Sequence, residues 1–397
     1  MAGEMIKVSD LQGEPFRLFF PLGWLAGVFA VAMWPLYFAD VYPFYPGMAH
    51  ARLMILGFIG AFVVGFLGTA LPRMLEVPAF GRWELWGFAL LWLAGVTAYT
   101  GLWLKAGDAF FLALFAGFML ALARRFPLRK DLPPPAFVLV LWGFAHLFAG
   151  LLLLLATPAF GWGSAWSRLG ADFLYQGFLL CPLLGIGTFL FPRLLGYAPM
   201  KVTFPGNPEP TPEWRRRAWL MFLAGLLIFT GFWVEAWLHA RAGAWLRAAT
   251  VLVFLILTVP FWKKNHAGGW YPLAVRAGLW GLAAGLLLFP LAASWRLPGL
   301  HLAFMAGFSM LTLLVATRVL YGHGGEIERF QAALPWAGLM LALTLGAIAA
   351  RVGADFRPEN YIALIWVSAL LWIVAALVWA VRVLIFVPFK EIENEND

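Results

Sequence analysis

The sequence predicts an all-α integral membrane protein with about twelve transmembrane helices, and three observations lead to that prediction. Of its 397 residues, 63% are hydrophobic and only 12% are charged, with a mean hydropathy of +0.83, which excludes a water-soluble globular protein. The chain divides into apolar runs of about 17 to 25 residues, the length that crosses a bilayer as a helix. Its 22 Trp and 37 Phe fit a chain that faces lipid and anchors helix ends at the membrane interface.

The apolar runs are taken in chain order. The first six predicted helices lie near residues 18–38, 50–72, 86–104, 109–123, 135–156 and 171–192. The second six lie near residues 217–238, 245–261, 274–293, 299–320, 332–350 and 361–386. Residues 1–397 are therefore expected to form a single transmembrane domain, with helices 1–6 over about 18–192 and helices 7–12 over about 217–386. The basic, Pro-rich segment 193–217 between the two sets is predicted to be a linker.

The positive charge indicates membrane orientation. Although the pI is near 9.8 and the net charge is +8, the Lys and Arg residues lie in short loops between apolar runs, which argues against a nucleic-acid surface. If the N-terminus is cytoplasmic, most of the basic residues fall on the cytoplasmic side, so both termini are expected there. The single cysteine, Cys181, lies within an apolar run and leaves no CxxCH attachment site, so any haem would be bound non-covalently.

A sequence repeat occurs at a spacing of four helices. The second predicted helix ends in GFLGTALPRML, the sixth in GIGTFLFPRLLG and the tenth in TLLVATRVLYG. These endings place Arg73, Arg193 and Arg318 at the inner ends of their helices. Each arginine alone is also what a positive-inside anchor would supply. Together they suggest three pseudo-repeated groups of four helices.

Two of the six histidines occur in matching contexts. His50 lies in PGMAHARLM and His301 in PGLHLAFM, each after a Pro-Gly turn and four residues before a methionine, Met54 or Met305. Both are at the start of even-numbered helices, which enter the membrane from the same outer face. His50 and His301 are therefore expected at similar depth, with each methionine on the same helix face as its histidine.

This pairing is compatible with two kinds of cofactor. Two neutral imidazoles can supply both axial ligands of a b-type haem, with Phe58, Phe304 and Phe308 packing on the macrocycle. A cluster of two histidines and two methionines would also suit Cu(I), a soft ion. Alternatively, the histidines are interfacial polar residues and the methionines fill gaps in the core.

The remaining candidate residues are less specific. His323, five residues after Arg318, suggests a second site at the inner end, for a quinol headgroup or haem propionates, or else an exposed helix end. His146 is expected to be a core histidine with its hydrogen bonds satisfied, and Glu235 to form an interfacial ion pair with a nearby arginine. No Ser/His/Asp set or nucleotide-binding motif is present.

Three segments together resemble the NnrS family: PFRLFF at 15–20, HARLMILGFIGAFVVGFLGTALP at 50–72 and HLAFMAGFSMLTLLVATRVLYGHGG at 301–325. Their order and spacing fit that family over nearly the whole chain. The resemblance implies a multi-pass haem protein of the bacterial inner membrane, linked to nitric oxide metabolism or denitrification, with copper also proposed. It implies cofactor-binding positions at His50, His301, Arg318 and His323. The sequence departs at Arg52 and Leu53, where the family usually has a second histidine and a glutamate.

The plan is also similar, distantly, to the catalytic subunit of haem-copper oxidases and nitric oxide reductases, in which histidines of helices 2 and 10 hold the low-spin haem. The other histidines of that active site have no counterpart, so gas reduction at a binuclear centre is not expected. The resemblance implies electron transfer, sensing or support of a nitric oxide reductase, with reductase subunits or a quinol or cytochrome redox partner. The alternatives are a non-catalytic accessory subunit and a transporter of a small solute or metal; whether the chain is an enzyme stays open.

Overall fold

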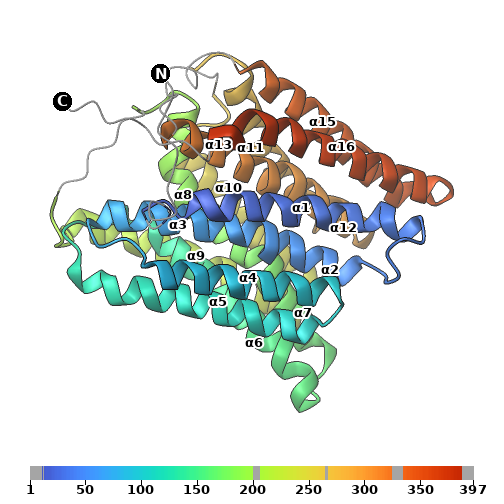
Figure 1. Ribbon diagram of the computed structural model, residues 1–397, viewed down its shortest axis with the longest axis horizontal. Helices are drawn as coiled ribbons and strands as arrows, with labels where there is room; N and C mark the ends of the chain where they lie inside the picture. The colour runs from blue at the N-terminus through green and yellow to red at the C-terminus, as the bar shows by residue number, and fades with distance from the viewer. Residues whose placement is uncertain (1–10, 12, 200–205, 264–266, 324–333, 387–397) are drawn as a thin grey trace.

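The computed structural model describes residues 11, 13–199, 206–263, 267–323 and 334–386, and these ranges contain helices and turns without any strand. The predicted all-α class is confirmed for this part of the chain. Part of the predicted linker, residues 200–205, and His266 lie outside the described residues. The helices fall into three successive sets of four long helices each (Figure 1).

The first set begins with α1 (Phe16–Phe38). Its second helix consists of α2 (Gly47–Arg52), the π-helix η2 (Leu53–Ile59) and α3 (Gly60–Leu75), and the set ends with α4 (Arg82–Thr100) and α5 (Leu104–Arg125). The second set contains α6 (Phe137–Phe160), then α7 (Ser164–Asp172), η4 (Phe173–Gly177) and α8 (Phe178–Leu194), then α9 (Pro212–Trp237) and α10 (Ala240–Thr258). The third set contains α11 (Trp270–Leu288), then α12 (Arg296–Leu302), η6 (Ala303–Met310) and α13 (Leu311–His323), then α15 (Pro335–Phe356) and α16 (Tyr361–Val383).

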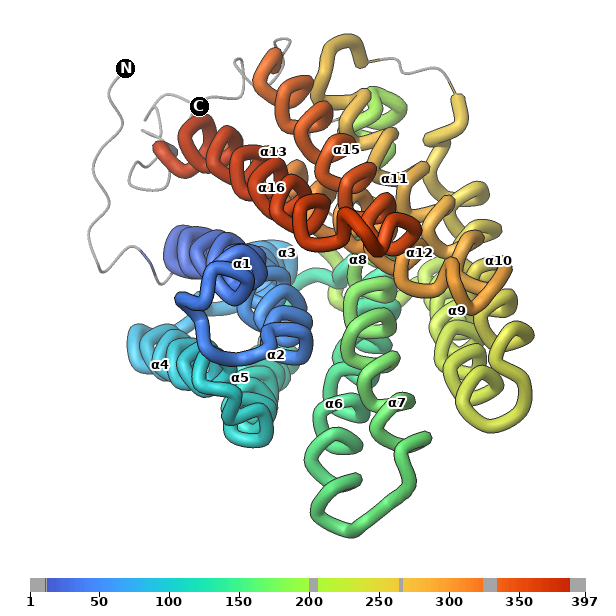
Figure 2. The backbone as a smooth tube through the Cα atoms, turned by 90° about the vertical axis from the view of Figure 1, so that its right-hand side faces the viewer, coloured from blue at the N-terminus to red at the C-terminus, as the bar shows by residue number. Residues whose placement is uncertain are grey.

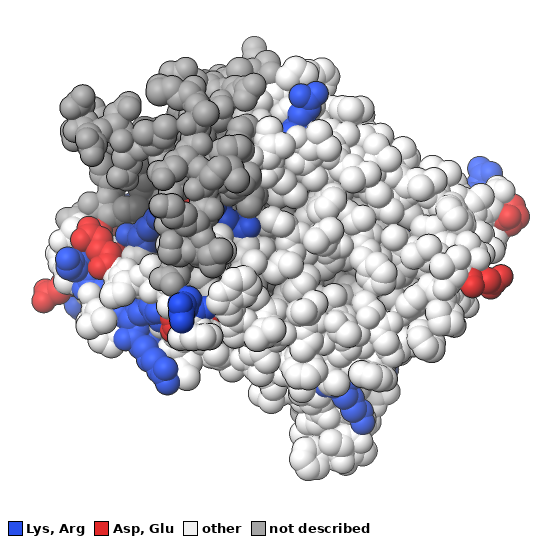
Figure 3. Space-filling view, in the orientation of Figure 1, with Lys and Arg blue, Asp and Glu red and all other residues white. Residues whose placement is uncertain are grey.

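Helix lengths and surface composition match a membrane-spanning chain. Among the described residues, eleven helical stretches are long and apolar enough to cross a bilayer; α4, with 19 residues and Arg82 and Glu84 in its first turn, falls outside that set. Large apolar side chains point outward, for example Leu257, which is 78% exposed. On the face shown in Figure 3, most charged side chains lie toward the two ends, and a broad uncharged surface lies between them. The chain is therefore a multi-pass membrane protein, as predicted.

The predicted helix boundaries agree with the observed ones to within seven residues, and local capping explains one of the larger differences. The helix expected from residue 217 begins at Pro212, because the Thr211 hydroxyl accepts a hydrogen bond from the Trp214 amide at 3.2 Å and proline suits the first helical position. The helix expected from residue 171 begins earlier, at Ser164. Both extensions consist of polar or mixed residues that a search for apolar runs leaves out.

Contacts between the sets follow the predicted grouping by four. The third and fourth helices pack together in every set: α4 on α5, α9 on α10 and α15 on α16. The last helix of each set packs on the first helix of the next, α5 on α6 and α10 on α11, and α16 returns to α1 and closes the ring. Figure 2 shows the three sets as separate blue, green-to-yellow and orange-to-red regions around a common centre.

The second helix of each set has the same interruption. An α-helical first part gives way to a π-helix and then to a longer α-helix: α2–η2–α3, α7–η4–α8 and α12–η6–α13. A π-helix is rare in proteins, and the π segments that do occur are frequently found at functional sites. Its recurrence at one place in three sets shows that the repeat extends to backbone detail, and it places His50 and His301 just before two of the three π segments.

Candidate functional site

His50 lies in the short first part of the second helix and is fixed by its neighbour α1. Its Nδ1 lies 2.8 Å from the carbonyl oxygen of Ala30, and its ring meets the edge of Trp34 with the ring centroids 6.1 Å apart. With the proton on Nδ1, this contact is an N–H···O=C hydrogen bond. The side chain is half-buried, so the imidazole is oriented without being enclosed.

His301, in the third set, also has its Nδ1 beside a backbone carbonyl, but this carbonyl belongs to its own helix. Its Nδ1 lies 3.0 Å from the carbonyl oxygen of Leu297, one turn earlier in α12, and its side chain is also half-buried. The imidazole interacts electrostatically with His50 and with the Arg351 guanidinium of α15. The two sequence-predicted histidines are therefore brought together from helices about 250 residues apart in the chain.

The free ring nitrogens decide what this pair can do. In the described part of the chain, the Nε2 atoms of His50 and His301 take no hydrogen bond, and neither is a buried atom without a partner. Both are accessible. A histidine that gives its Nδ1 proton to a carbonyl presents the Nε2 lone pair, which is the usual arrangement of a metal-ligating imidazole.

The surroundings of the histidine pair are apolar, with one charged group. Met54, Phe304 and Met305 lie about one turn further along their helices, half-buried and packed against the core. Arg351 is buried and forms an ion pair with Asp355 at 2.8 Å. The placement of Met54 and Met305 as ligands stays a prediction, and Arg351 is an additional cation that the sequence did not point to.

A tight aromatic layer lies about two turns further into the bundle. Phe58 packs edge-on against Trp372 of α16, with ring centroids 6.0 Å apart, and the Trp372 indole N–H donates to the Ser309 hydroxyl at 3.2 Å. One turn deeper, Phe62 packs on Trp379. Space for a planar group at the histidine pair is therefore bounded on its inner side by Phe58 and Trp372.

The predicted inner residues occupy a different place. The Nδ1–H of His323 donates to Glu14 Oε1 at 2.9 Å, and Arg73 donates to the other ring nitrogen at 3.1 Å and to Glu14 at 2.9 Å. Arg17 pairs with the same carboxylate. We call these four residues the Glu14 cluster. It joins the start of α1 to the ends of α3 and α13.

Arg318 has its own surroundings. It lies five residues before His323 on α13. Its guanidinium interacts electrostatically with Tyr271 of α11. His301 and His323 are 22 residues apart, which is about 33 Å along a helix, so they belong to opposite ends of the bundle. Arg318 and His323 therefore do not contribute to the site formed by His50 and His301.

The Glu14 cluster makes the free energy of unfolding depend on pH. Burial raises the pKa of the Glu14 carboxyl, but the hydrogen bonds from His323 and Arg17 outweigh this and hold the pKa at about 2, below its ordinary value of 4.5. The depressed pKa means that stability is present above about pH 4.5 and is lost as the pH falls toward 2.

We therefore expect Glu14→Gln to lower the free energy of unfolding at pH 7 by about 1–3 kcal/mol, the range for charged hydrogen bonds. The substitution should also remove this share of the acid dependence. Thermal unfolding of both proteins in detergent between pH 7 and pH 3 checks this. Parallel stability profiles for the two proteins would contradict it.

Sequence reasoning missed a buried ion pair beside the histidine site. Arg52 Nε and Nη2 donate to Asp108 of α5 at 2.8 and 3.2 Å, and Tyr99 donates to the same carboxylate at 2.7 Å. Arg52 Nη1 also donates to the Tyr175 hydroxyl of η4 at 3.1 Å. We call these four residues the Arg52 network. Asp108 lies between two predicted helices, three residues after Lys105, so the sequence gave no sign that it is buried.

The structure confirms that His146 is buried, but it corrects the prediction that the hydrogen bonds of this histidine are satisfied. Its Nδ1 lies 2.6 Å from the Trp142 carbonyl oxygen, but its Nε2 is buried without a hydrogen-bond partner among the described residues. The imidazole is therefore only half satisfied. It packs against Gly177, where any Cβ would come within 2.3 Å of the ring, so glycine is required at the end of η4.

Glu235 also forms more than the predicted interfacial pair. It binds buried Arg247 at 2.5 Å and Arg296 of α12 at 2.8 Å, and Arg296 continues to Asp172 at 3.3 Å. These charges are compensated within the bundle, as intramembrane charges must be. Within the described ranges, no three His, Cys, Asp or Glu side chains gather in the way a metal site requires.

Comparison with known proteins gives one result that covers nearly the whole chain. The family model described as NnrS protein matches residues 11–387. No curated protein matches the chain.

Proposed function

Because the chain belongs to the NnrS family, a membership that fits a membrane protein associated with nitric oxide, we propose that it is a b-type haem protein with His50 and His301 as the axial ligands. The observation that supports this proposal most is that the two imidazoles have the same nitrogen, Nδ1, hydrogen-bonded to a backbone carbonyl. Each is oriented through Nδ1 by a carbonyl, at 2.8 or 3.0 Å, and each leaves Nε2 accessible.

The residues around the pair fit such a group. Phe304 and the apolar stems near it supply a wall for the macrocycle, while Phe58 and Trp372 limit the space on the inner side. Arg351, which is paired with Asp355, places a guanidinium near both histidines, and a guanidinium can also bind the carboxylates that haem carries. A bound haem supplies one-electron redox chemistry at this position.

Two strong ligands favour electron transfer over gas binding, because they leave the iron no open position. The proposed roles are therefore electron transfer, sensing through loss of one ligand, or support of a nitric oxide reductase. The proposal places the chain in a bacterial inner membrane with both termini cytoplasmic. Its partners would be reductase subunits or a quinol or cytochrome redox partner.

The test is an oxidised and dithionite-reduced visible spectrum of the purified protein, with iron and copper determined on the same sample. We expect the sharp bands of a low-spin b-type haem and about one iron per chain for one histidine pair. A colourless protein without iron would contradict the proposal and leave the transporter and accessory-subunit alternatives.

Copper is the second candidate because Met54 and Met305 lie near the histidines with half-buried side chains. Under the haem proposal, Met54→Leu and Met305→Leu, which nearly conserve volume, should leave the spectrum and the iron content unchanged. Copper that copurifies with the wild type and is lost in both variants would instead assign the pair to Cu(I).

A further inference from the structure

We propose that the second set of helices, which places no histidine in the site, fixes the spacing of the histidine pair through Asp172 and Tyr175. Both residues belong to one short stretch, since Asp172 directly precedes the π-helix η4 and Tyr175 lies within it. Each contacts the start of a different histidine-bearing helix. They act as positioning residues for the site formed by His50 and His301. Haem as the occupant rests on the proposed function, whereas the spacing of the pair does not.

The second set has no ligand at the position that carries the histidine in the first set. His50 lies three residues before η2, and the residue three positions before η4 is Gly170. A Cβ atom at Gly170 would lie 2.9 Å from Leu153 Cβ of α6 and 3.1 Å from the carbonyl oxygen of Gly150. Because α7 and α6 pack this closely, no histidine side chain fits at that position. The second helix of this set is therefore arranged for packing and not for ligation.

The contact to the first histidine-bearing helix passes through Tyr175. Arg52 lies two residues after His50, and its Nη1 donates to the Tyr175 hydroxyl at 3.1 Å. The same guanidinium donates to Asp108 of α5 at 2.8 and 3.2 Å. Arg52 is only 6% exposed, so little water competes for these hydrogen bonds. The helix α2 is thereby tied to η4 as well as to α5.

The contact to the second histidine-bearing helix passes through Asp172. Arg296, the first residue of α12, lies five residues before His301, and its Nη2 donates to Asp172 at 3.3 Å. Its Nη1 donates to Glu235 of α9 at 2.8 Å. Gln176 of η4 donates to the same Asp172 oxygen at 2.9 Å and orients the carboxylate. The start of α12 is therefore held by two carboxylates of the second set.

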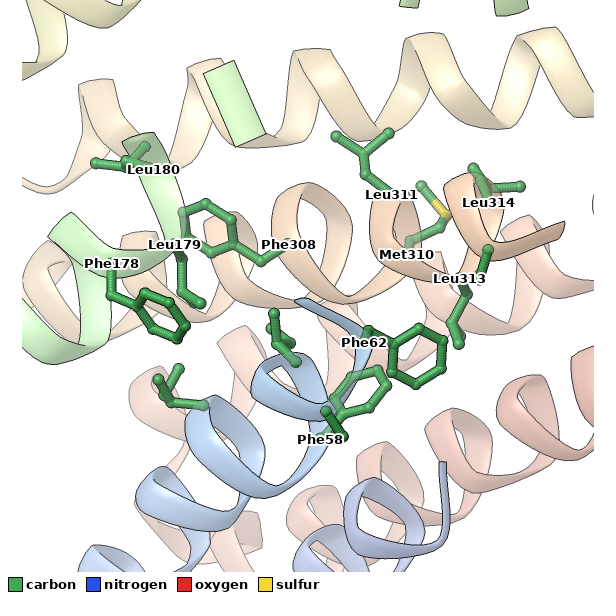
Figure 4. Packing of buried hydrophobic residues seen from close by; sticks show 14 of the residues in the cluster. Phe58, Phe62, Phe178, Leu179, Leu180, Phe308, Met310, Leu311, Leu313 and Leu314 are labelled. Carbon is green, nitrogen blue, oxygen red and sulfur yellow. The ribbon is translucent and has the colours of Figure 1, made fainter. Parts of the chain in front are cut away.

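The two contacts meet where the second helices of the three sets lie together. Asp172 and Tyr175 are three residues apart and interact electrostatically with each other. Phe178, the residue after η4, lines the same space as Phe62 of α3 and Phe308 of η6, and Figure 4 shows these three rings. A shift of η4 would move the supports of both histidine-bearing helices together. The second set therefore controls how the two imidazoles face each other, as supporting groups do for ligating histidines.

The spacing is measured without any cofactor, by electron–electron double resonance between spin labels on the two helices of the full chain. Labels are attached through Met48→Cys on α2 and Leu297→Cys on α12, where the side chains are 61% and 47% exposed, with buried Cys181→Ala as the background. We expect Asp172→Asn and Tyr175→Phe each to broaden the distance distribution, and the double variant to broaden it most. Asp172→Glu, which keeps the charge, should restore the distribution of the parent protein.

Two matched controls make the same chemical changes at the other end of the bundle. Glu84→Gln alters a carboxylate that is paired with Arg125 at 2.6 Å, and Tyr271→Phe removes a buried hydroxyl that donates to the carbonyl oxygen of Leu314. Both should leave the distance distribution unchanged. Equal broadening in these controls, or an unchanged distribution in the double variant of Asp172 and Tyr175, would overturn the proposal.

A bound haem provides an independent measurement. The electron paramagnetic resonance g values of a low-spin ferric haem with two imidazole ligands depend on the orientation of the two rings. We expect Asp172→Asn and Tyr175→Phe to shift these g values at unchanged iron content, which a loss of folded protein would not do. Broadened distances in a colourless protein would keep the positioning role and reject the haem, and unchanged distances with an intact haem would do the reverse. If Asp172→Asn fails to fold, Tyr175→Phe, which loses only a hydroxyl, decides by itself.

Discussion

His50→Ala and His301→Ala are each expected to abolish the low-spin haem spectrum and to lower the iron content of the purified protein by at least about tenfold. Each substitution removes one of the two accessible Nε2 atoms. A single axial imidazole binds haem less tightly and gives a high-spin spectrum, so retained haem would still change its bands. The measurement is the oxidised and reduced visible spectrum with iron analysis on matched protein amounts.

The other histidines provide controls that distinguish ligation from damage to the fold. His239→Ala changes an exposed histidine at the start of α10, where Nδ1 accepts the Ala242 amide at 3.2 Å, and should leave the spectrum intact. His146→Ala removes a buried imidazole far from the pair in sequence and tests whether its unpartnered Nε2 binds the iron instead. If the haem spectrum is retained in His50→Ala and His301→Ala but lost in His146→Ala, the proposed ligand lies in the second set of helices instead.

Much of the fold follows from apolar length, because crossing a bilayer requires a continuous run that satisfies its own backbone hydrogen bonds. The histidine pair was also visible in the sequence, since the Pro-Gly turn, the histidine and the methionine recur in the same order near residues 50 and 300. The same reasoning could not find the π segments. Their side chains are those of any apolar helix, so the hydropathy pattern does not distinguish them.

The buried charges show the other limit. Asp108 and Arg52 are 56 residues apart, and Asp172 and Arg296 are 124 residues apart, so neither pair has a local spacing that identifies it. Each charge alone resembled a residue near a helix end. Only tertiary contact shows that such groups are compensated. For His146 the sequence gave the depth correctly, but the missing partner of Nε2 depends on the aromatic rings of Phe173 and Phe229 that surround it.

Asp108→Ala is expected to lower the free energy of unfolding by about 3–5 kcal/mol, because it leaves the buried Arg52 guanidinium without its counter-charge. The Arg52 network connects α2 to α5 and, through Tyr175, to η4. His50 lies two residues before Arg52, so a shift of α2 should also reduce haem retention on heating. Thermal unfolding in detergent, followed by tryptophan fluorescence and by the haem spectrum, measures both effects.

Two comparisons decide whether the buried ion pair is the cause. Glu213→Ala removes an exposed carboxylate paired with Arg217 at 2.6 Å, and should cost no more than about 1 kcal/mol. Arg52→Leu combined with Asp108→Leu removes both buried charges and should recover most of the loss, because well-packed apolar residues avoid the desolvation of an unpaired ion. If Asp108→Ala costs no more than Glu213→Ala, the network does not hold the histidine-bearing helix in place. If the double variant is as unstable as Asp108→Ala, side-chain packing and not charge is the dominant contribution of these residues.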